Sequence, residues 1–316
     1  MSNRSTVTEF LLLGFSDVRE LQILHFVLFL VIYLMGLVGN LLIITVVALD
    51  HHLHTPMYFF LGNLSILDLG FISVTVPKSM ANSLLDTRLI SYPACVSQVF
   101  LFMFFGSADI GILTVMAYDR YVAICHPLHY ERTMNRRACV HMAASAWVSS
   151  LLYSVLHTGS TFAISFCGGH MVDQFFCDIP QLLKLACPDS NRSETGVIGF
   201  SACLVVSCFV LILASYVLIF RAVLRIPSQQ GPHKAFSTCL PHLTAISLIF
   251  FTGVFAYLKP TSSSTSLLDL VVDVFYSVVP PVLNPIIYSM RNKELKAALR
   301  KLTGQRLFMA NKMSLL

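Results

Sequence analysis

The sequence predicts an all-α membrane protein, a bundle of seven transmembrane helices with the N-terminus outside. Hydrophobic residues make up 56% of the 316 residues and charged residues only 12%, whereas soluble domains carry about 25% charged residues. Apolar segments of about 20 residues recur along the chain, and each is long enough to cross a hydrocarbon core of about 30 Å. We expect seven spans, at about residues 23–49, 57–82, 92–125, 138–162, 196–222, 237–258 and 269–290.

The distribution of Lys and Arg sets the orientation, because cytoplasmic loops are enriched in these residues. Of the 21 Lys and Arg residues, thirteen fall in one set of connections with the C-terminal tail and seven in the other, with Arg120 at a helix end left aside. We therefore expect an extracellular N-terminal tail at 1–22, a seven-helix membrane domain at 23–290, and a cytoplasmic helix and tail at 291–316. The net charge of +5 reflects this topology and does not indicate nucleic-acid binding.

The N-terminal tail lacks the basic start, long apolar run and small-residue cleavage site of a signal peptide, so we expect it to be retained. Asn3 begins a glycosylation sequon in this tail and Asn191 begins another in an outer loop, whereas the sequon at Asn63 lies inside a span. We expect a glycan at Asn3, with Asn191 as a second candidate.

Asp68 and Asp109 are carboxylates deep in the second and third spans, and Asp109 lies about 15 Å along the helix from Arg120. Buried acids are costly unless they are hydrated, protonated or bound to a cation. Two interpretations remain open, a pair that shares a proton and a sodium site completed by a group such as Asn284. No other metal site is expected, because ligand spacing is lacking among four histidines, His51, His52, His54 and His126.

Four cysteines are expected on the outer side. Cys95 lies 25 residues before Arg120, about 37 Å along a helix, so these two residues lie at opposite membrane surfaces. The loop after the fourth span adds Cys167, Cys177 and Cys187 in the same oxidising compartment, and the spacing leaves all three pairings open. The other cysteines are expected to be small buried hydrophobes: Cys125, Cys139, Cys203, Cys208 and Cys239.

Prolines and polar residues interrupt the last two spans. Pro241 loosens the sixth helix near its start, and His242 places an imidazole in apolar surroundings, as expected at the base of a movable helix. The segment PPVLNPIIY at 280–288 predicts a proline-broken seventh helix. After it, basic residues of 291–302 alternate with apolar ones, which is typical of an amphipathic helix on the inner membrane surface. The apolar residues are Leu295, Ala298, Leu299 and Leu302.

Five motifs that together extend over nearly the whole chain resemble those of the vertebrate odorant-receptor family, which belongs to the rhodopsin-like (class A) G-protein-coupled receptors. They are LHTPMYFFLGNLSILD (53–68), MAYDRYVAICHPLHY (116–130), SY (215–216), KAFSTCLPHL (234–243) and PPVLNPIIYSMRN (280–292). Three residues depart from the usual family pattern: Asp109, Pro241 and Phe250. These departures leave the expected fold intact and bear on the response to ligand.

The resemblance implies a plasma-membrane receptor without enzymatic activity that activates a stimulatory, olfactory-type G protein and raises cyclic AMP. It pairs Cys95 with Cys177 and Cys167 with Cys187. It also implies a switch at the cytoplasmic face made of Asp119, Arg120, Tyr121, Tyr216, His242 and Tyr288.

The ligand pocket is expected in the outer half of the bundle. Apolar walls with scattered hydroxyls suit a small neutral volatile, which gains mainly by desolvation and one or two hydrogen bonds. An amine would find no evident counter-ion there, and the seventh span has no Lys to hold retinal as a Schiff base. The candidate lining residues are Phe102, Met103, Gly106, Ser107, Ser201, Val205, Phe250, Gly253, Val254, Tyr257, Val274 and Ser277.

Other function classes fit the sequence less well. A transporter would usually show an internal repeat with paired discontinuous helices, and a membrane enzyme would need a nucleophile with its base or a metal cluster. A receptor of the same fold that serves outside smell, for instance for a metabolite, remains open, because its fold and switch would be the same.

Overall fold

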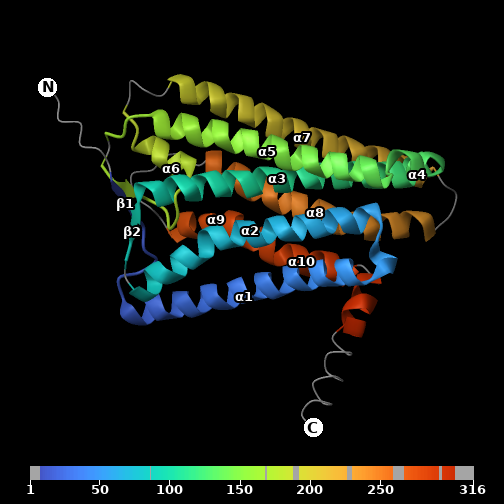
Figure 1. The fold of residues 1–316 in the computed structure, drawn as a ribbon, viewed down its shortest axis with the longest axis horizontal. Coiled ribbons are helices and arrows are strands. Elements are labelled where there is room, and N and C mark those ends of the chain that lie inside the picture. Colours follow the sequence, from blue (N-terminus) through green and yellow to red (C-terminus); the bar gives the residue numbers. More distant parts are fainter. Residues whose placement is uncertain are drawn as a thin grey trace, which may run out of the picture.

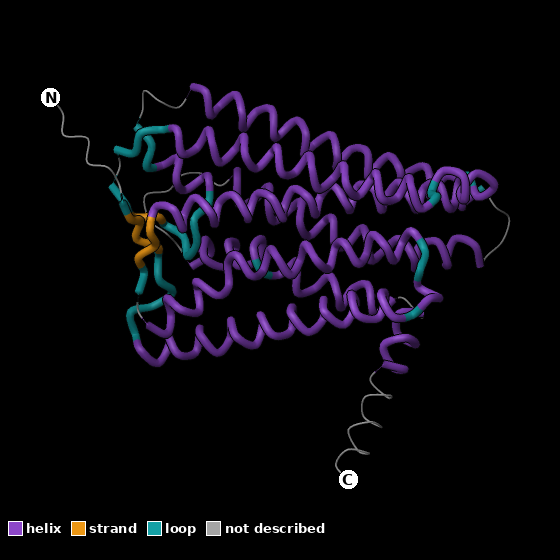
Figure 2. Tube along the Cα trace, viewed as in Figure 1, coloured by secondary structure: helices purple, strands orange, loops and turns teal. Residues whose placement is uncertain are grey.

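The computed structural model is a bundle of long helices with a small sheet at one end (Figures 1 and 2), and it describes residues 8–85, 87–167, 169–187, 192–225, 230–258, 267–291 and 294–302. The long helices are α1 (Arg19–Leu49), α2 (Pro56–Leu85), α3 (Tyr92–Cys125), α5 (Arg136–Ala163), α7 (Arg192–Leu224), α8 (Gln230–Leu258), α9 (Leu267–Ser277) and α10 (Val279–Arg291). The short ones are η1 (His51–Leu53), η2 (Pro127–His129), α4 (Tyr130–Thr133) and α6 (Ile179–Lys184).

The predicted seven-helix bundle is confirmed. Five helices, α1, α2, α3, α5 and α7, are each long and apolar enough to cross a membrane, and α8 is a further long helix of the bundle. The last span consists of α9 and α10, which meet at a bend of 51°. The bend lies at Val278, just before Pro280, because the first turn of a helix tolerates proline whereas a continuing helix does not.

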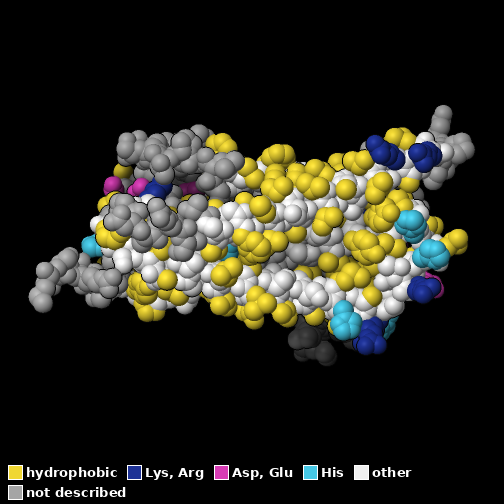
Figure 3. Space-filling model, turned by 90° about the horizontal axis from the view of Figure 1, so that it is seen from above, with side chains coloured by type: hydrophobic (Ala, Val, Ile, Leu, Met, Phe, Trp, Pro, Cys, Tyr) yellow, Lys and Arg dark blue, Asp and Glu magenta, His cyan; other side chains and the backbone are white. Residues whose placement is uncertain are grey.

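Hydrophobic side chains cover the middle of the molecule, as a membrane-spanning surface requires (Figure 3). In the same view, the Lys and Arg side chains that are drawn gather mainly at the end that carries α4, together with several histidines. Basic residues at this end fit its assignment to the cytoplasm. One sequence expectation was wrong here, because Cys203 is exposed on the outward face of α7, while Cys139 and Cys239 are buried.

A three-stranded sheet that the sequence did not predict lies at the opposite end. Strand β1 (Glu9–Leu12) pairs antiparallel with β2 (Leu89–Ser91) and parallel with β3 (Met171–Val172). Phe10 and Leu12 of β1 are buried in an apolar cluster that includes the cysteine pair Cys95 and Cys177. Part of the expected N-terminal tail therefore packs on the outer end of the bundle, and α1 begins at Arg19, a few residues before the predicted start.

The segment after α10 is helical at 294–302. Leu295 is fully buried and Ala298 nearly so, and both belong to the main core cluster of the bundle. The Tyr58 hydroxyl at the start of α2 donates a 2.8 Å hydrogen bond to Glu294 Oε2. Two apolar residues of the expected amphipathic helix, Leu295 and Ala298, therefore pack against the bundle.

Helix α3 lies at the centre of the bundle and contacts α2, α5, α7 and α8. Its close approach to α5 depends on Gly111, because a Cβ atom added there would lie 3.1 Å from Ala146 Cβ and 3.6 Å from Ala146 Cα. Small residues at such positions allow helices to pack tightly in membranes.

A leucine at Gly111 is expected to lower the melting temperature of the purified protein, because overpacking costs about 1–3 kcal/mol. Gly159, on the same helix as Ala146, is the matched control, since a Cβ atom there would meet nothing within 4 Å. A thermal shift assay on both variants tests this, and equal melting temperatures for the two leucine variants would contradict it.

Candidate functional site

The inner end of α3 carries a buried positive charge. The Arg120 side chain is only 8% exposed, and its Nη2 lies 4.0 Å from Met57 Sδ at the start of α2. Its charge acts electrostatically on Tyr216 of α7, His242 of α8 and Tyr288 of α10. Four helices thus bring together residues that the sequence scattered over most of the chain.

Two of these neighbours of Arg120 are joined by a hydrogen bond. The Tyr216 hydroxyl and His242 Nδ1 are 2.5 Å apart, and both side chains are buried. This bond joins α7 to α8 beside Arg120. The Tyr288 hydroxyl is also buried, and it has no hydrogen-bond partner among the described residues, so it is free to take a new partner if the helices shift.

Asp119 and Tyr121, the neighbours of Arg120 in sequence, point to different partners. The Tyr130 hydroxyl of α4 donates a 2.8 Å hydrogen bond to Asp119 Oδ1. Burial and the nearby carboxylate raise the pKa of Tyr130, so its hydroxyl keeps the donated proton. Tyr121 lies instead against His126, with its hydroxyl 3.0 Å from Nε2. Tyr130 lies in one of the motifs, but no role was predicted for it, because residue spacing does not indicate a hydrogen bond across the turn after α3.

The two acids in the middle of the bundle lie close enough to act on each other electrostatically. Asn284 Nδ2 of α10 donates to both carboxylate oxygens of Asp68, at 3.1 Å and 3.2 Å. Asp109 of α3 is buried close enough to act electrostatically on Asp68. Asp109 Oδ1 and Asn284 Oδ1 have no hydrogen-bond partner among the described side chains. Buried oxygen atoms in such a cluster can hold a shared proton or a small hard cation.

In the outer half, the predicted α3 residues border an aromatic cluster. The Phe102 ring lies 4.6 Å from Phe71, 5.1 Å from Phe176 and 5.7 Å from Tyr276, measured between centroids. Met103 packs against the same cluster. A Cβ atom on Gly106 would lie 3.1 Å from the Phe71 ring, so the absence of a side chain at Gly106 allows the ring to pack there.

The other predicted pocket residues lie in several different environments. The hydroxyls of Ser107 and Ser277 donate hydrogen bonds to backbone carbonyls one turn earlier in their own helices, at 2.6 Å and 2.5 Å. Phe250 stacks on Phe209 of α7 with centroids 3.7 Å apart. Val274 packs against the aromatic cluster. Val205, Gly253 and Val254 are half-buried, and the side chain of Tyr257 lies outside the described residues.

Sequence reasoning missed two polar groups in the outer half. His157 of α5 is 3% exposed and hydrogen-bonds Ser201 of α7 through Nε2. Its ring lies against Tyr153 in a tilted arrangement, with centroids 4.4 Å apart. Its Nδ1 has no partner among the described residues. The signal was available, because a histidine in an apolar span needs partners wherever it occurs.

The second missed group is the buried Asp178. This carboxylate accepts hydrogen bonds from the Tyr276 hydroxyl of α9 and, at 2.8 Å, from the Ile179 backbone N–H at the start of α6. It follows Cys177 directly, so it ties the second outer loop to the last span. Nothing in the spacing of these residues predicts this bond.

Two disulfides hold the outer loop. They join Cys95 to Cys177 with Cα atoms 5.6 Å apart and Cys167 to Cys187 with Cα atoms 5.0 Å apart. These are the two pairs that the family resemblance implies. Gln98 strengthens the first connection, since its Oε1 accepts a 2.8 Å hydrogen bond from the Cys177 backbone N–H.

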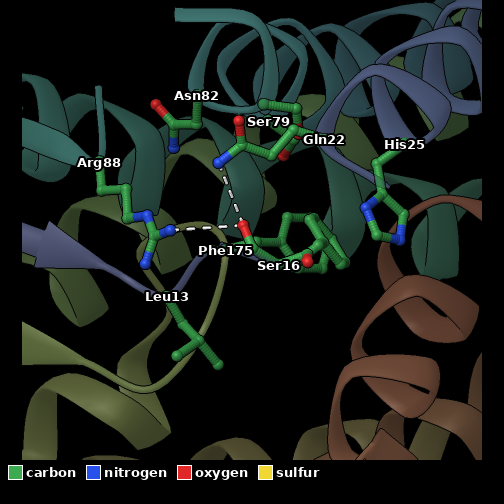
Figure 4. A pocket seen from close by; sticks show the side chains of 11 residues that line it. Leu13, Ser16, Gln22, His25, Ser79, Asn82, Arg88 and Phe175 are labelled. Carbon is green, nitrogen blue, oxygen red and sulfur yellow. Dashed lines mark hydrogen bonds between the residues drawn. The ribbon is translucent and has the colours of Figure 1, made fainter. Parts of the chain in front are cut away.

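A small polar cavity lies between the N-terminal segment and the outer ends of α1 and α2 (Figure 4). Gln22 Nε2 and Arg88 Nη2 both donate to the Ser16 carbonyl, at 3.2 Å and 3.4 Å, and Arg88 pairs with Asp17. The Asn82 amide lines the cavity and finds no partner among the described residues. The cavity measures about 10 Å³, room for roughly one water molecule. It is therefore too small for an odorant, and its lining shares no residue with the predicted pocket.

The sequence as a whole is similar to olfactory receptors. The model of the family described as "Olfactory receptor" matches residues 29–306. The chain is 54% identical to the human protein Olfactory receptor 14A16 over 95% of its own length and 96% of that protein's length. It is 50% identical to human Olfactory receptor 14J1 over 100% of its length and 98% of the relative. With human Olfactory receptor 14I1, it shares 54% identity over 96% of the chain and 97% of the relative.

Proposed function

The chain belongs to the olfactory receptor family and is therefore an odorant-sensing G-protein-coupled receptor of the plasma membrane, and from this premise we propose how it works. Small, mostly neutral volatile molecules bind in the outer half of the bundle. Binding opens the cytoplasmic face around Arg120 to a stimulatory G protein, which raises cyclic AMP.

The observation that carries this proposal is the position of α3. One continuous helix bears Phe102 at the outer aromatic cluster and Arg120 among the inner polar groups, about 27 Å apart along its axis. The acid at Asp109 lies between them on the same helix. A ligand that shifts α3 against its neighbours therefore acts on the aromatic cluster, the buried acids and the Arg120 cluster together, because a packed helix moves as a rigid element.

The proposed switch is the cluster around Arg120. The bond between Tyr216 and His242 holds α7 and α8 together beside the guanidinium. We expect activation to move α8 outward, which breaks this bond and exposes Arg120 to the G protein. Tyr288, whose hydroxyl lacks a partner among the described residues, can then bond within the rearranged site.

A cyclic AMP screen of cells that express this chain, run against a broad panel of volatiles, tests the proposal. We expect responses to small neutral compounds, because the predicted pocket residues are apolar or carry hydroxyls. Cells expressing the same chain with Phe102→Ala provide the pocket control and should lose most of the response. Silence across the panel, or a response that survives this substitution unchanged, would contradict the proposed pocket.

We further propose that Asp68, Asp109 and Asn284 hold a sodium ion. Sodium should then raise the melting temperature of the purified receptor by about 2–4 °C relative to an organic cation, since about 1 kcal/mol of binding linkage produces such a shift. Asp68→Asn should remove the sodium dependence, whereas Glu131→Gln, at an exposed position, should retain it. If sodium does not change the melting temperature of the unaltered receptor, the result would favour a proton shared by Asp68 and Asp109 instead.

A further inference from the structure

A groove of about 810 Å³ runs between the outer halves of α2 and α3. It opens on the outward surface of the bundle, because Leu101 at its edge is 37% exposed and Ser73 and Ser97 are exposed as well. Its size falls in the range of pockets that hold drug-sized ligands, about 300–1,000 Å³. In a bundle that crosses a membrane, this surface faces lipid.

The part of the groove nearer the membrane centre is apolar. Phe105 and Gly70 form its inner end, and a Cβ atom on Gly70 would lie 2.3 Å from the Phe105 ring, so the ring lies directly on the glycine. Val74 and Leu101 continue the walls. The Ser97 hydroxyl is bonded to the Pro93 carbonyl of its own helix, so it presents little polarity to an occupant. These walls suit an acyl chain.

The outer part of the groove carries a charge. Lys78 is the one charged side chain among the described residues that line the groove. It lies about 33 Å of helix from Pro56 at the inner end of α2, so it reaches the outer boundary of a hydrocarbon core about 30 Å thick. Its Nζ donates a 2.8 Å hydrogen bond to the Leu89 carbonyl, which uses one of three ammonium donors and holds the amine at the mouth of the groove.

We propose that this groove binds a phospholipid of the outer leaflet, with its phosphate on Lys78 and one acyl chain extending toward Gly70 and Phe105. The distance from Lys78 to Gly70 is about 12 Å along α2. A lipid whose phosphate lies at the boundary beside Lys78 would therefore place its acyl chain in the hydrocarbon core beside Gly70. Lysine at a membrane boundary extends its amine to headgroups while its stem stays in apolar surroundings. Charge at one end and apolar walls at the other favour a phospholipid over a free hydrocarbon.

Native mass spectrometry of the purified full-length receptor in detergent tests the headgroup contact. The probes are phosphatidylglycerol and diacylglycerol with identical chains, and we expect retention of the former only. Lys78→Gln should weaken retention of phosphatidylglycerol by roughly fivefold, which corresponds to about 1 kcal/mol for one basic residue at a membrane surface. Lys184→Gln is the matched control, because Lys184 is an exposed residue of α6 outside the groove. Equal retention of both lipids, or unchanged retention by Lys78→Gln, would overturn the proposal.

A second experiment tests the acyl-chain contact. Phosphatidylglycerol with a diazirine in its chain should label α3 peptides that contain Leu101 and Phe105, and Leu101→Trp should fill the groove and remove most of this label. Labelling of α5 near Val148, which is 57% exposed, is the internal reference and should not change. Equal labelling of both surfaces, or full α3 labelling in a Leu101→Trp receptor that keeps its melting temperature, would overturn the proposal.

Discussion

Replacing Arg120 by alanine is expected to abolish cyclic AMP signalling while the receptor still reaches the cell surface. Arg120 interacts electrostatically with three helices at the inner end of the bundle, so its loss removes the group on which the proposed switch acts. In this variant Asp119 keeps its hydrogen bond from Tyr130, so we expect no large loss of folding stability. Constitutive cyclic AMP and the response to any active volatile from the panel are the two readouts.

The matched control for this experiment is Arg132→Ala. Arg132 is exposed in α4 on the cytoplasmic side, so its removal takes away one positive charge from the same face without touching the buried cluster. Surface labelling of intact cells normalises both variants for delivery. Full signalling by Arg120→Ala, or an equal loss in both variants, would contradict the role proposed for Arg120.

The overall architecture was predictable because a membrane constrains it so strongly. Any helix that crosses the bilayer must be apolar over about 20 residues, and the expected third span at 92–125 matches α3 (Tyr92–Cys125) at both ends. The same constraint leaves the outer sheet unpredicted. Strands of four, three and two residues are too short for a periodic pattern, and only β3 lies in the loop that the disulfides hold.

The candidate site was predictable only in part, because its hydrogen bonds join residues far apart in sequence. Asn284 was expected beside the acids, and it does donate to Asp68 from 216 residues away. The bond from Tyr276 to Asp178 had no comparable signal. His157 lies in an apolar span and so needed a partner, but its sequence position did not indicate Ser201. Residue type identifies a polar group inside a span, but only the packing of the helices selects its partner.

Apolar pocket positions were the hardest to assign from sequence. In a span, the residues that face lipid and the residues that face the interior are both mostly apolar. The pattern of polarity therefore does not distinguish the two faces. Cys203 was expected to be buried and is exposed, whereas Ser201, two residues earlier, is buried against His157. Two residues in one turn of α7 thus differ in burial although both lie in the same apolar span.

Replacing Cys95 by serine is expected to prevent delivery of the receptor to the cell surface. The Cys95–Cys177 bond closes a separation of 82 residues and lies under the outer sheet, where both cysteines are fully buried. Loss of a native disulfide typically costs about 2–5 kcal/mol, a large share of a total stability of about 5–15 kcal/mol. Receptors that fail to fold are retained inside the cell, so an epitope tag at the N-terminus should stain permeabilised cells but not intact ones.

Two further variants separate the bond from the thiol. Cys177→Ser should fail to the same degree, and the double variant should be no worse than either single one, because all three remove the same bond. Cys203→Ser is the control, since this free cysteine is exposed on α7, and it should reach the surface normally. Normal delivery of Cys95→Ser, or a double variant clearly worse than both singles, would show that delivery does not depend on this disulfide.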